Sequence, residues 1–120
     1  PDQILLHNGR MTLIDFDLYC MGDPALDIGN FIGHLTEHSL RHFGRPDALA
    51  GLEAALHDRF VALAGAHTSA NVHAYATLTL VRHIQLSTLL PERQAFTRPL
   101  LALCEQRLGI TCHDRRALSA

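Results

Sequence analysis

The 120-residue sequence contains no lysine, so all ten of its basic residues are arginines. A Schiff base or a phosphate clamp that needs a lysine therefore cannot come from this chain. No block of basic residues stands out and the formal net charge is −2, which argues against a nucleic-acid-binding surface. Apolar runs are short and interrupted by polar residues, so the sequence shows no membrane span and no signal peptide.

Cysteine is also scarce, because only Cys20, Cys104 and Cys112 are present and they form no CxxC pair. A disulfide framework is not expected, and a cytoplasmic, reducing location fits this composition better. With 48% hydrophobic residues, the chain can bury a core, and its length predicts a single domain over residues 1–120. The sequence runs from Pro1 directly into strand-like residues, so we expect the native polypeptide to continue upstream.

A β-hairpin is predicted near the start, where two short apolar runs flank Asn8-Gly9. Asn-Gly is favoured in two-residue hairpin turns because both turn positions need positive φ. Such a turn fixes the strand register and places Gln3 opposite Ile14. The side chains of Gln3 and Asp15 are therefore expected close together at the open end of the hairpin.

The pattern becomes helical after the hairpin and a loop. Asp23-Pro24 indicates a helix N-cap followed by proline at the first helical position, and Gly44 with Pro46 indicates the end of that helix. The fold class expected is α+β and mostly helical, with a short β-hairpin followed by about four α-helices. We expect three parts, a hairpin and metal loop over 1–24, a helical part over 25–110 and a tail over 111–120. The expected helices cover about 24–43, 47–64, 71–90 and 99–108.

Side-chain patterns indicate how these helices pack. Gly29 and Gly33 are four residues apart on the first helix, so another backbone can approach closely on that side. The third helix is apolar nearly all round, which predicts a central position. The second helix is expected to bury one stripe, composed of Leu49, Leu52, Leu56, Phe60 and Leu63.

Four aspartates lie within residues 15–27, among apolar neighbours. Carboxylates are rarely buried without a partner. Asp15 is expected to end a buried strand, and Asp2 or Gln3 could supply a second oxygen beside it, which is the ligand chemistry that Mg²⁺ takes. A loop cap, in which Asp15 accepts backbone N–H bonds, explains the same residue type equally well.

The other three aspartates have structural explanations. Asp23 is explained as a helix N-cap, a role that contributes roughly 1 kcal/mol. Asp27 lies in the first helical turn, where negative charge suits the helix dipole, and it could instead accept hydrogen bonds from a neighbouring loop. Asp17 could be a second metal contact, although a solvated loop acid is the favoured interpretation.

The sequence resembles a known family in two segments, IDFD at residues 14–17 and GDPALDIG at residues 22–29. They resemble the aminoglycoside phosphotransferase and choline kinase-like family, which has a protein-kinase-like fold. In that family a hydrophobic strand carries I-D-[FW]-[DE], and G-D-P-x-x-D-[LI]-[AG] follows after a short gap. The hairpin resembles the end of the family's H-G-D-x-H-x-x-N segment and the strand after it. The likeness is close over the first part of the chain, and the later helices fit the family's helical lobe only in kind.

The resemblance implies roles for individual residues. Asp15 corresponds to the aspartate that holds Mg²⁺ against the β- and γ-phosphates of ATP. Gln3 occupies the position at which the family has an asparagine that binds the second Mg²⁺. The longer side chain of glutamine is a departure from the family. Asp27 corresponds to an aspartate that steadies the catalytic loop, and Asp23 with Pro24 remains the helix cap.

The resemblance implies that this chain is the C-terminal part of a bacterial, ATP- and Mg²⁺-dependent phosphotransferase that acts on a hydroxyl of a small molecule. The catalytic aspartate and the N-lobe lysine are expected upstream of Pro1, so no catalytic residue is expected here and the isolated chain should be inactive. The expected partners are a nucleotide and a hydroxyl acceptor, without nucleic acid or membrane, and a homodimer could form through the exposed lobe surface. Two alternatives stay open, a pseudokinase-like module that binds without catalysis and a helical interaction domain.

Histidines suggest a weaker candidate. His34, His38 and His42 are spaced four apart on the first predicted helix, near Glu37. Two histidines at i and i+4 can bind Zn²⁺, but the HExxH pattern is missing and the third histidine lies a further turn away. A half-exposed polar stripe is the favoured interpretation, and His83 on the third helix is interpreted as a rim residue.

Overall fold

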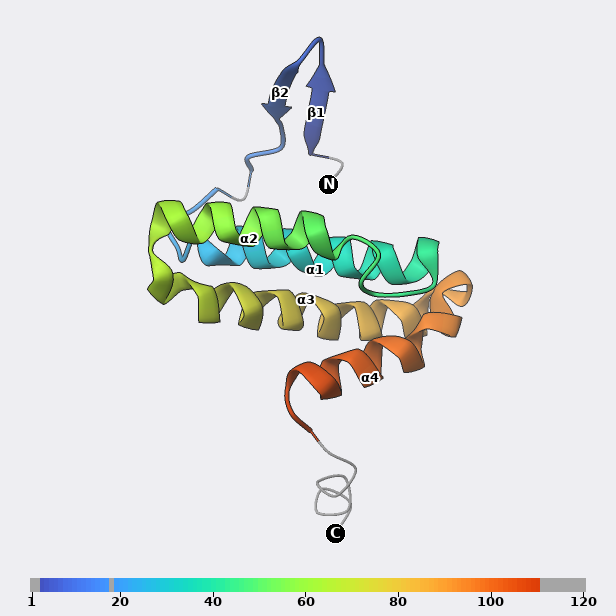
Figure 1. Ribbon diagram of the computed structural model, residues 1–120. Coiled ribbons are helices and arrows are strands. Elements are labelled where there is room, and N and C mark those ends of the chain that lie inside the picture. Colours follow the sequence, from blue (N-terminus) through green and yellow to red (C-terminus); the bar gives the residue numbers. More distant parts are fainter. Residues whose placement is uncertain (1–2, 18, 111–120) are drawn as a thin grey trace.

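The computed structural model describes residues 3–17 and 19–110, so Asp2 and the expected tail lie outside the described residues. The described part is mostly helical, with one two-stranded antiparallel sheet and four α-helices, as the sequence predicts (Figure 1). The elements are β1 (Ile4–His7), β2 (Arg10–Leu13), α1 (Ala25–Phe43), α2 (Ala50–Ala64), η1 (Ala66–Thr68), α3 (Ser69–Leu89), η2 (Pro91–Phe96) and α4 (Thr97–Arg107).

The hairpin has the predicted register. The Ile14 N–H donates to the Gln3 carbonyl at 3.0 Å, directly beyond the last strand pair. Asn8 (φ 48°) and Gly9 (φ 72°) both have positive φ, as a two-residue turn of this type requires. The turn chemistry alone was therefore sufficient to place Gln3 and Asp15 at the same end of the hairpin.

The expectation that Asp15 ends a buried strand is wrong. All four residues of β2 are exposed, and the hairpin extends away from the helices (Figure 1). Apart from Leu5, the apolar residues of the two strands share one face, because side chains directly opposite each other in a ladder point to the same side. That face is built from two paired positions on each strand, Ile4 with Leu13 and Leu6 with Met11.

The closest helix contact joins α1 to α3. A Cβ atom added at Gly29 would lie 2.6 Å from the Val72 carbonyl oxygen, and one at Gly33 would lie 2.8 Å from the Ala76 carbonyl oxygen. The two glycines therefore let the backbone of α3 approach α1, which confirms the prediction from their spacing. α3 also packs against α4 and η2, so its predicted central position is confirmed (Figure 1).

Two apolar clusters form the core on either side of this contact. The first joins α1 and α3 to the inner side of α2, and the second joins α1 and α3 to α4. The buried members of the first cluster are Ala25, Ile32, Val72 and Ala76. Those of the second are Leu40, Leu80, Leu100 and Cys104.

The buried stripe predicted for α2 is only partly buried. Leu56 and Phe60 pack against the first cluster, but Leu52 is 55% exposed and Leu63 is 71% exposed. α2 touches the bundle along one narrow side, mainly against α1, and none of its residues is fully buried. A helix at the edge of a layer buries less of its apolar stripe than periodicity alone suggests.

Helix boundaries follow local chemistry to within a few residues. α1 ends at Phe43, and Gly44 (φ 72°) donates its N–H to the Leu40 carbonyl, as a glycine C-cap does. α3 ends just before Pro91, which is the first residue of η2. α4 follows η2 and begins at Thr97, slightly before the predicted start. Within the described residues, none of the helices has both the length and the apolar character needed to cross a bilayer.

Candidate functional site

The open end of the hairpin joins two of the predicted metal-binding residues. Gln3 Nε2 donates a hydrogen bond to Asp15 Oδ2 at 2.9 Å, and both side chains are exposed. Asp15 has φ 65°, a left-handed backbone conformation that costs a non-glycine residue roughly 1 kcal/mol or more. Such backbone strain clusters at ligand sites, so this outlier favours a functional role for Asp15.

The donor chemistry of this pair fits a hard cation. A carboxylate and an amide oxygen are both ligands that Mg²⁺ accepts, and Mg²⁺ usually keeps several waters. The amide nitrogen of Gln3 faces the carboxylate, so the amide group must turn over before its oxygen can join Asp15 around one cation. Among residues 3–17 and 19–110, no three His, Cys, Asp or Glu side chains gather as a metal site. Asp17 lies two residues further along the same loop and is exposed.

Asp23 and Asp27 both lie where α1 begins. Asp23 Oδ1 accepts the Ala25 N–H at 2.9 Å, and its Oδ2 accepts Asn71 Nδ2 at 2.8 Å. Asp23 therefore satisfies a free N–H at the start of α1 and ties this end to α3, with Pro24 in helical backbone conformation beside it. Asp27 is exposed in the first turn, where its charge complements the helix dipole.

The interpretation of His83 as a rim residue is wrong, because it is only 5% exposed. Its Nε2 lies 3.1 Å from His34 Nδ1, and the two rings meet edge to face at 87°. His34 therefore turns toward α3, whereas the rings of His38 and His42 lie together with centroids 4.1 Å apart. The three histidines of α1 do not converge on one point, which agrees with a polar stripe.

Glu37 extends this histidine pair into a partly buried polar network. Its Oε1 accepts Arg41 Nε at 3.1 Å and lies 4.0 Å from His83 Nδ1. Burial is the largest influence on both histidines and lowers the pKa of His34 and of His83, while the Glu37 carboxylate opposes this effect. The network thus holds two neutral imidazoles between α1 and α3.

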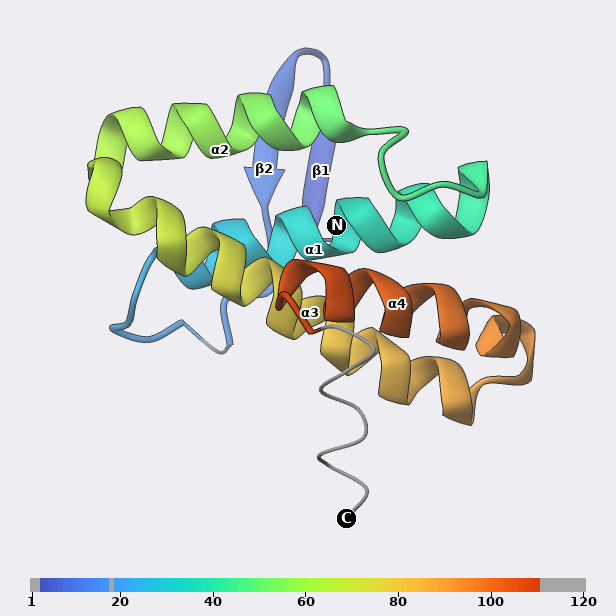
Figure 2. The same ribbon diagram turned by 60° about the horizontal axis from the view of Figure 1, so that its bottom comes forward.

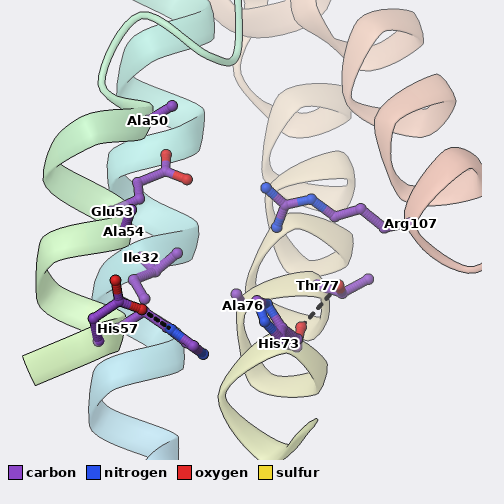
Figure 3. A pocket seen from close by; sticks show the side chains of 10 residues that line it. Ile32, Ala50, Glu53, Ala54, His57, His73, Ala76, Thr77 and Arg107 are labelled. Atoms are coloured by element: carbon purple, nitrogen blue, oxygen red, sulfur yellow. Dashed lines mark hydrogen bonds and ion pairs between the residues drawn. The ribbon is translucent and has the colours of Figure 1, made fainter. Parts of the chain in front are cut away.

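A cavity of about 560 Å³ forms a second candidate site (Figure 3). It lies among α1, α2, α3 and the end of α4. Its apolar lining is small and comprises Ile32, Ala50, Ala54 and Ala76. Its polar lining comprises Glu53, His57, Asp58, His73, Thr77 and Arg107.

A buried hydroxyl joins the two charged walls of this cavity. Thr36 Oγ1 lies 2.9 Å from Glu53 Oε1 and 3.0 Å from the Ile32 carbonyl oxygen, two acceptors that share its single proton, and it accepts a hydrogen bond from Arg107 Nη2 at 3.2 Å. Thr36 is 1% exposed, so its hydroxyl is fixed between the two charged side chains. Opposite charges from α2 and α4 are thereby held near each other without a direct ion pair between them in the described part of the chain.

Two imidazole rings form another wall. His57 Nδ1 lies 3.0 Å from Asp58 Oδ1 and His57 Nε2 lies 2.9 Å from Ser69 Oγ, so both nitrogens of this ring have partners. The ring stacks on His73 with centroids 4.8 Å apart. Burial lowers the pKa of His73, and electrostatic interactions with His57 and Arg107 lower it further.

This cavity has no counterpart in the sequence-based predictions. Its polar residues come from three helices and match no local motif. The only local signal was the pair Glu53 and His57, which are four residues apart on one helix face. Arg107 joins them only because α4 folds back along α3.

A scan against protein-family models finds no match, and searches of curated proteins and of solved structures find none either. Functional inference therefore depends on the motifs and on the geometry of the two sites.

Proposed function

We propose that this chain is the C-terminal, metal-binding lobe of an ATP- and Mg²⁺-dependent phosphotransferase that resembles the aminoglycoside phosphotransferases and transfers the ATP γ-phosphate to a hydroxyl of a small molecule. One observation carries the proposal. The Asp15 carboxylate lies 2.9 Å from the Gln3 amide, in a left-handed backbone conformation, at the point where the IDFD segment leaves the hairpin. The capped start of α1 follows directly, in the order that the family pattern requires.

The proposal assigns each of the predicted site residues a separate role in phosphoryl transfer. Such transfer depends mainly on positioning and on stabilising charge, and a bound Mg²⁺ supplies the positive charge that the β- and γ-phosphates need. Asp15 would hold the cation, and Gln3 would add its amide oxygen after its amide group turns over. Asp27 would steady the catalytic loop, whose aspartate base we expect upstream of Pro1. Asp23 accepts the Ala25 N–H at the start of α1, next to Pro24, and would hold this end of α1 in place.

One observation favours the alternative of a pseudokinase-like module that binds without catalysis. The Gln3 amide already satisfies one oxygen of Asp15, so the pair is stable in the absence of a cation. A module of this kind would bind ATP equally well with and without Mg²⁺. Thermal unfolding of the chain with ATP, in the presence of Mg²⁺ or of a chelator, separates the two functions.

The activity test uses the protein expressed from the complete reading frame. We expect ATP-dependent phosphorylation of hydroxylated amines, and we expect Asp15→Asn to lower the rate at least about 100-fold because it removes a charge that holds the metal. Asp47→Asn is the matched control, since Asp47 is an exposed carboxylate between α1 and α2. Equal rates for Asp15→Asn and the control would contradict the proposal, as would Asp15-dependent ATP turnover by residues 1–120 alone.

A further inference from the structure

We infer that the cavity between α2 and α4 binds a small zwitterion, a compound with one ammonium and one carboxylate group a few atoms apart. Its volume of about 560 Å³ suits a small ligand. Figure 3 shows Glu53 from α2 and Arg107 from α4 reaching into the cavity from opposite walls. The hairpin and α4 lie on opposite sides of the layer formed by α1, α2 and α3 (Figures 1 and 2), and the inference does not depend on the metal chemistry proposed for the hairpin.

The two charged walls have unused hydrogen-bonding capacity. A guanidinium has five N–H donors and a carboxylate has about four acceptor positions. Thr36 accounts for one donor of Arg107 and one acceptor position of Glu53, and no ion pair joins the two within the described residues. A ligand carboxylate can form a bidentate pair with Arg107 while a ligand ammonium donates to Glu53.

The shared Thr36 hydroxyl sets the ligand's length. Glu53 Oε1 lies 2.9 Å and Arg107 Nη2 lies 3.2 Å from the same oxygen, so the two binding groups are only a few ångströms apart. Hydrogen bonds of ordinary length to both groups fit a ligand whose charges are joined by about two to four carbon atoms. The alanines and Ile32 of the lining leave room for this apolar spacer.

Ligands of a single charge fit less well. A purely anionic ligand would lie beside the carboxylates of Glu53 and Asp58, and a purely cationic one would face the guanidinium of Arg107. His73 does not change this balance, because burial and the nearby His57 and Arg107 side chains lower its pKa. Arg107 is therefore the cation that a ligand carboxylate meets at neutral pH.

The test follows the ring C–H signals of His57 and His73 by NMR while 4-aminobutyrate is added to the 120-residue chain. The matched probes are n-butylamine and butyrate, each of which carries only one of the two charges. We expect a saturable shift with 4-aminobutyrate and a dissociation constant at least about tenfold lower than with either matched probe. The pKa of His73 should also rise on binding, because the ligand carboxylate offsets the charge of Arg107.

Three variants locate the binding site. Glu53→Gln keeps an acceptor for Thr36 but removes the charge, Arg107→Gln removes the guanidinium, and Ala54→Leu fills the cavity without altering any charge. Each should reduce 4-aminobutyrate binding to the level of the single-charge probes, whereas the control Arg98→Gln, on the exposed side of α4, should not. Circular dichroism identifies any variant that fails to fold. The folded variants then show whether 4-aminobutyrate binds in this cavity.

The inference is overturned by any of three results. Butylamine or butyrate could bind as tightly as 4-aminobutyrate, which would show that one charge suffices. Binding could persist in the folded variants, which would place the ligand elsewhere. The histidine signals could show no saturable shift, which would mean that the cavity is filled by another part of the chain or is only a gap between helices.

Discussion

His34 and His83 show how two helices can share a buried polar contact. Their ring nitrogens lie 3.1 Å apart, and Glu37 lies beside them together with Arg41. The sequence did not predict this contact, because a helix that is apolar nearly all round does not reveal which polar residue faces inward. The pairing of Gln3 with Asp15 was predictable, since a two-residue turn fixes which residues lie opposite each other.

The pairing of half-buried His34 with buried His83 should make the fold sensitive to acid. The pKa of each histidine is lower in the folded chain than its value of about 6.5 in the unfolded chain. As the pH falls below about 6.5, the unfolded chain therefore binds more protons than the folded chain does. We expect the free energy of unfolding to decrease from pH 7 to pH 5, by up to about 1.4 kcal/mol per pH unit for each additional proton bound by the unfolded chain. Urea unfolding at several pH values measures this slope.

The variant His83→Gln isolates this contribution. In this variant the free energy of unfolding should depend less on pH. The control Gln85→Ala, at an exposed position on the same helix, should show the same pH dependence as the wild type. Equal slopes for His83→Gln and the wild type would show that the buried pair does not cause the acid sensitivity.

At the scale of whole elements, the contact between α1 and α3 depends on the absence of side chains. Two glycines four residues apart predicted it, because their spacing places both on one helix face. The exposure of the outer edge of α2 was not predictable in the same way. Periodicity shows which side of a helix is apolar, but the number of neighbours on that side is a property of the assembled fold.

Gly33→Ala should destabilise the protein although alanine favours helix. The added Cβ would lie 2.6 Å from the Thr79 Cβ and 2.8 Å from the Ala76 carbonyl oxygen, so the helices must move apart. We expect a loss of about 1–3 kcal/mol in the free energy of unfolding, as overpacked cores show. Gly51→Ala is the matched control, because a Cβ at Gly51 meets nothing within 4 Å, and it should gain about 0.5–1 kcal/mol. Equal effects of the two substitutions on chemical denaturation would show that the close approach is not needed.

At the scale of the whole molecule, the described part divides into a helical bundle and a hairpin with an uncovered apolar face. The mostly helical class and the element order followed from turn residues, caps and periodicity. A kinase-like lobe remains a prediction from the IDFD and GDPALDIG segments. No local pattern could have predicted the cavity, because Thr36, Glu53 and Arg107 meet only in the assembled bundle.

The apolar hairpin face should drive self-association of the chain. Leu6 is 78% exposed and Met11 is 67% exposed, and they are paired across the hairpin on one face. We expect a concentration-dependent dimer in sedimentation experiments and a monomer after Leu6→Glu, because the charge would be buried in the interface. Leu5→Glu places the same charge on the opposite face and should preserve the dimer. A wild-type chain that stays monomeric at about 100 μM, well above the micromolar range of specific association, would contradict this expectation.

The most direct test of the proposed metal-binding lobe is a titration of the 120-residue chain with Mn²⁺, in which electron paramagnetic resonance measures the free ion. Mn²⁺ takes the same oxygen ligands as Mg²⁺. If Asp15 holds the cation, Asp15→Asn should weaken binding at least about tenfold, which corresponds to roughly 1.4 kcal/mol, while Asp47→Asn should bind as the wild type does. Unchanged Mn²⁺ binding in Asp15→Asn, or equal weakening in both variants, would contradict the assignment of the hairpin end as a metal site.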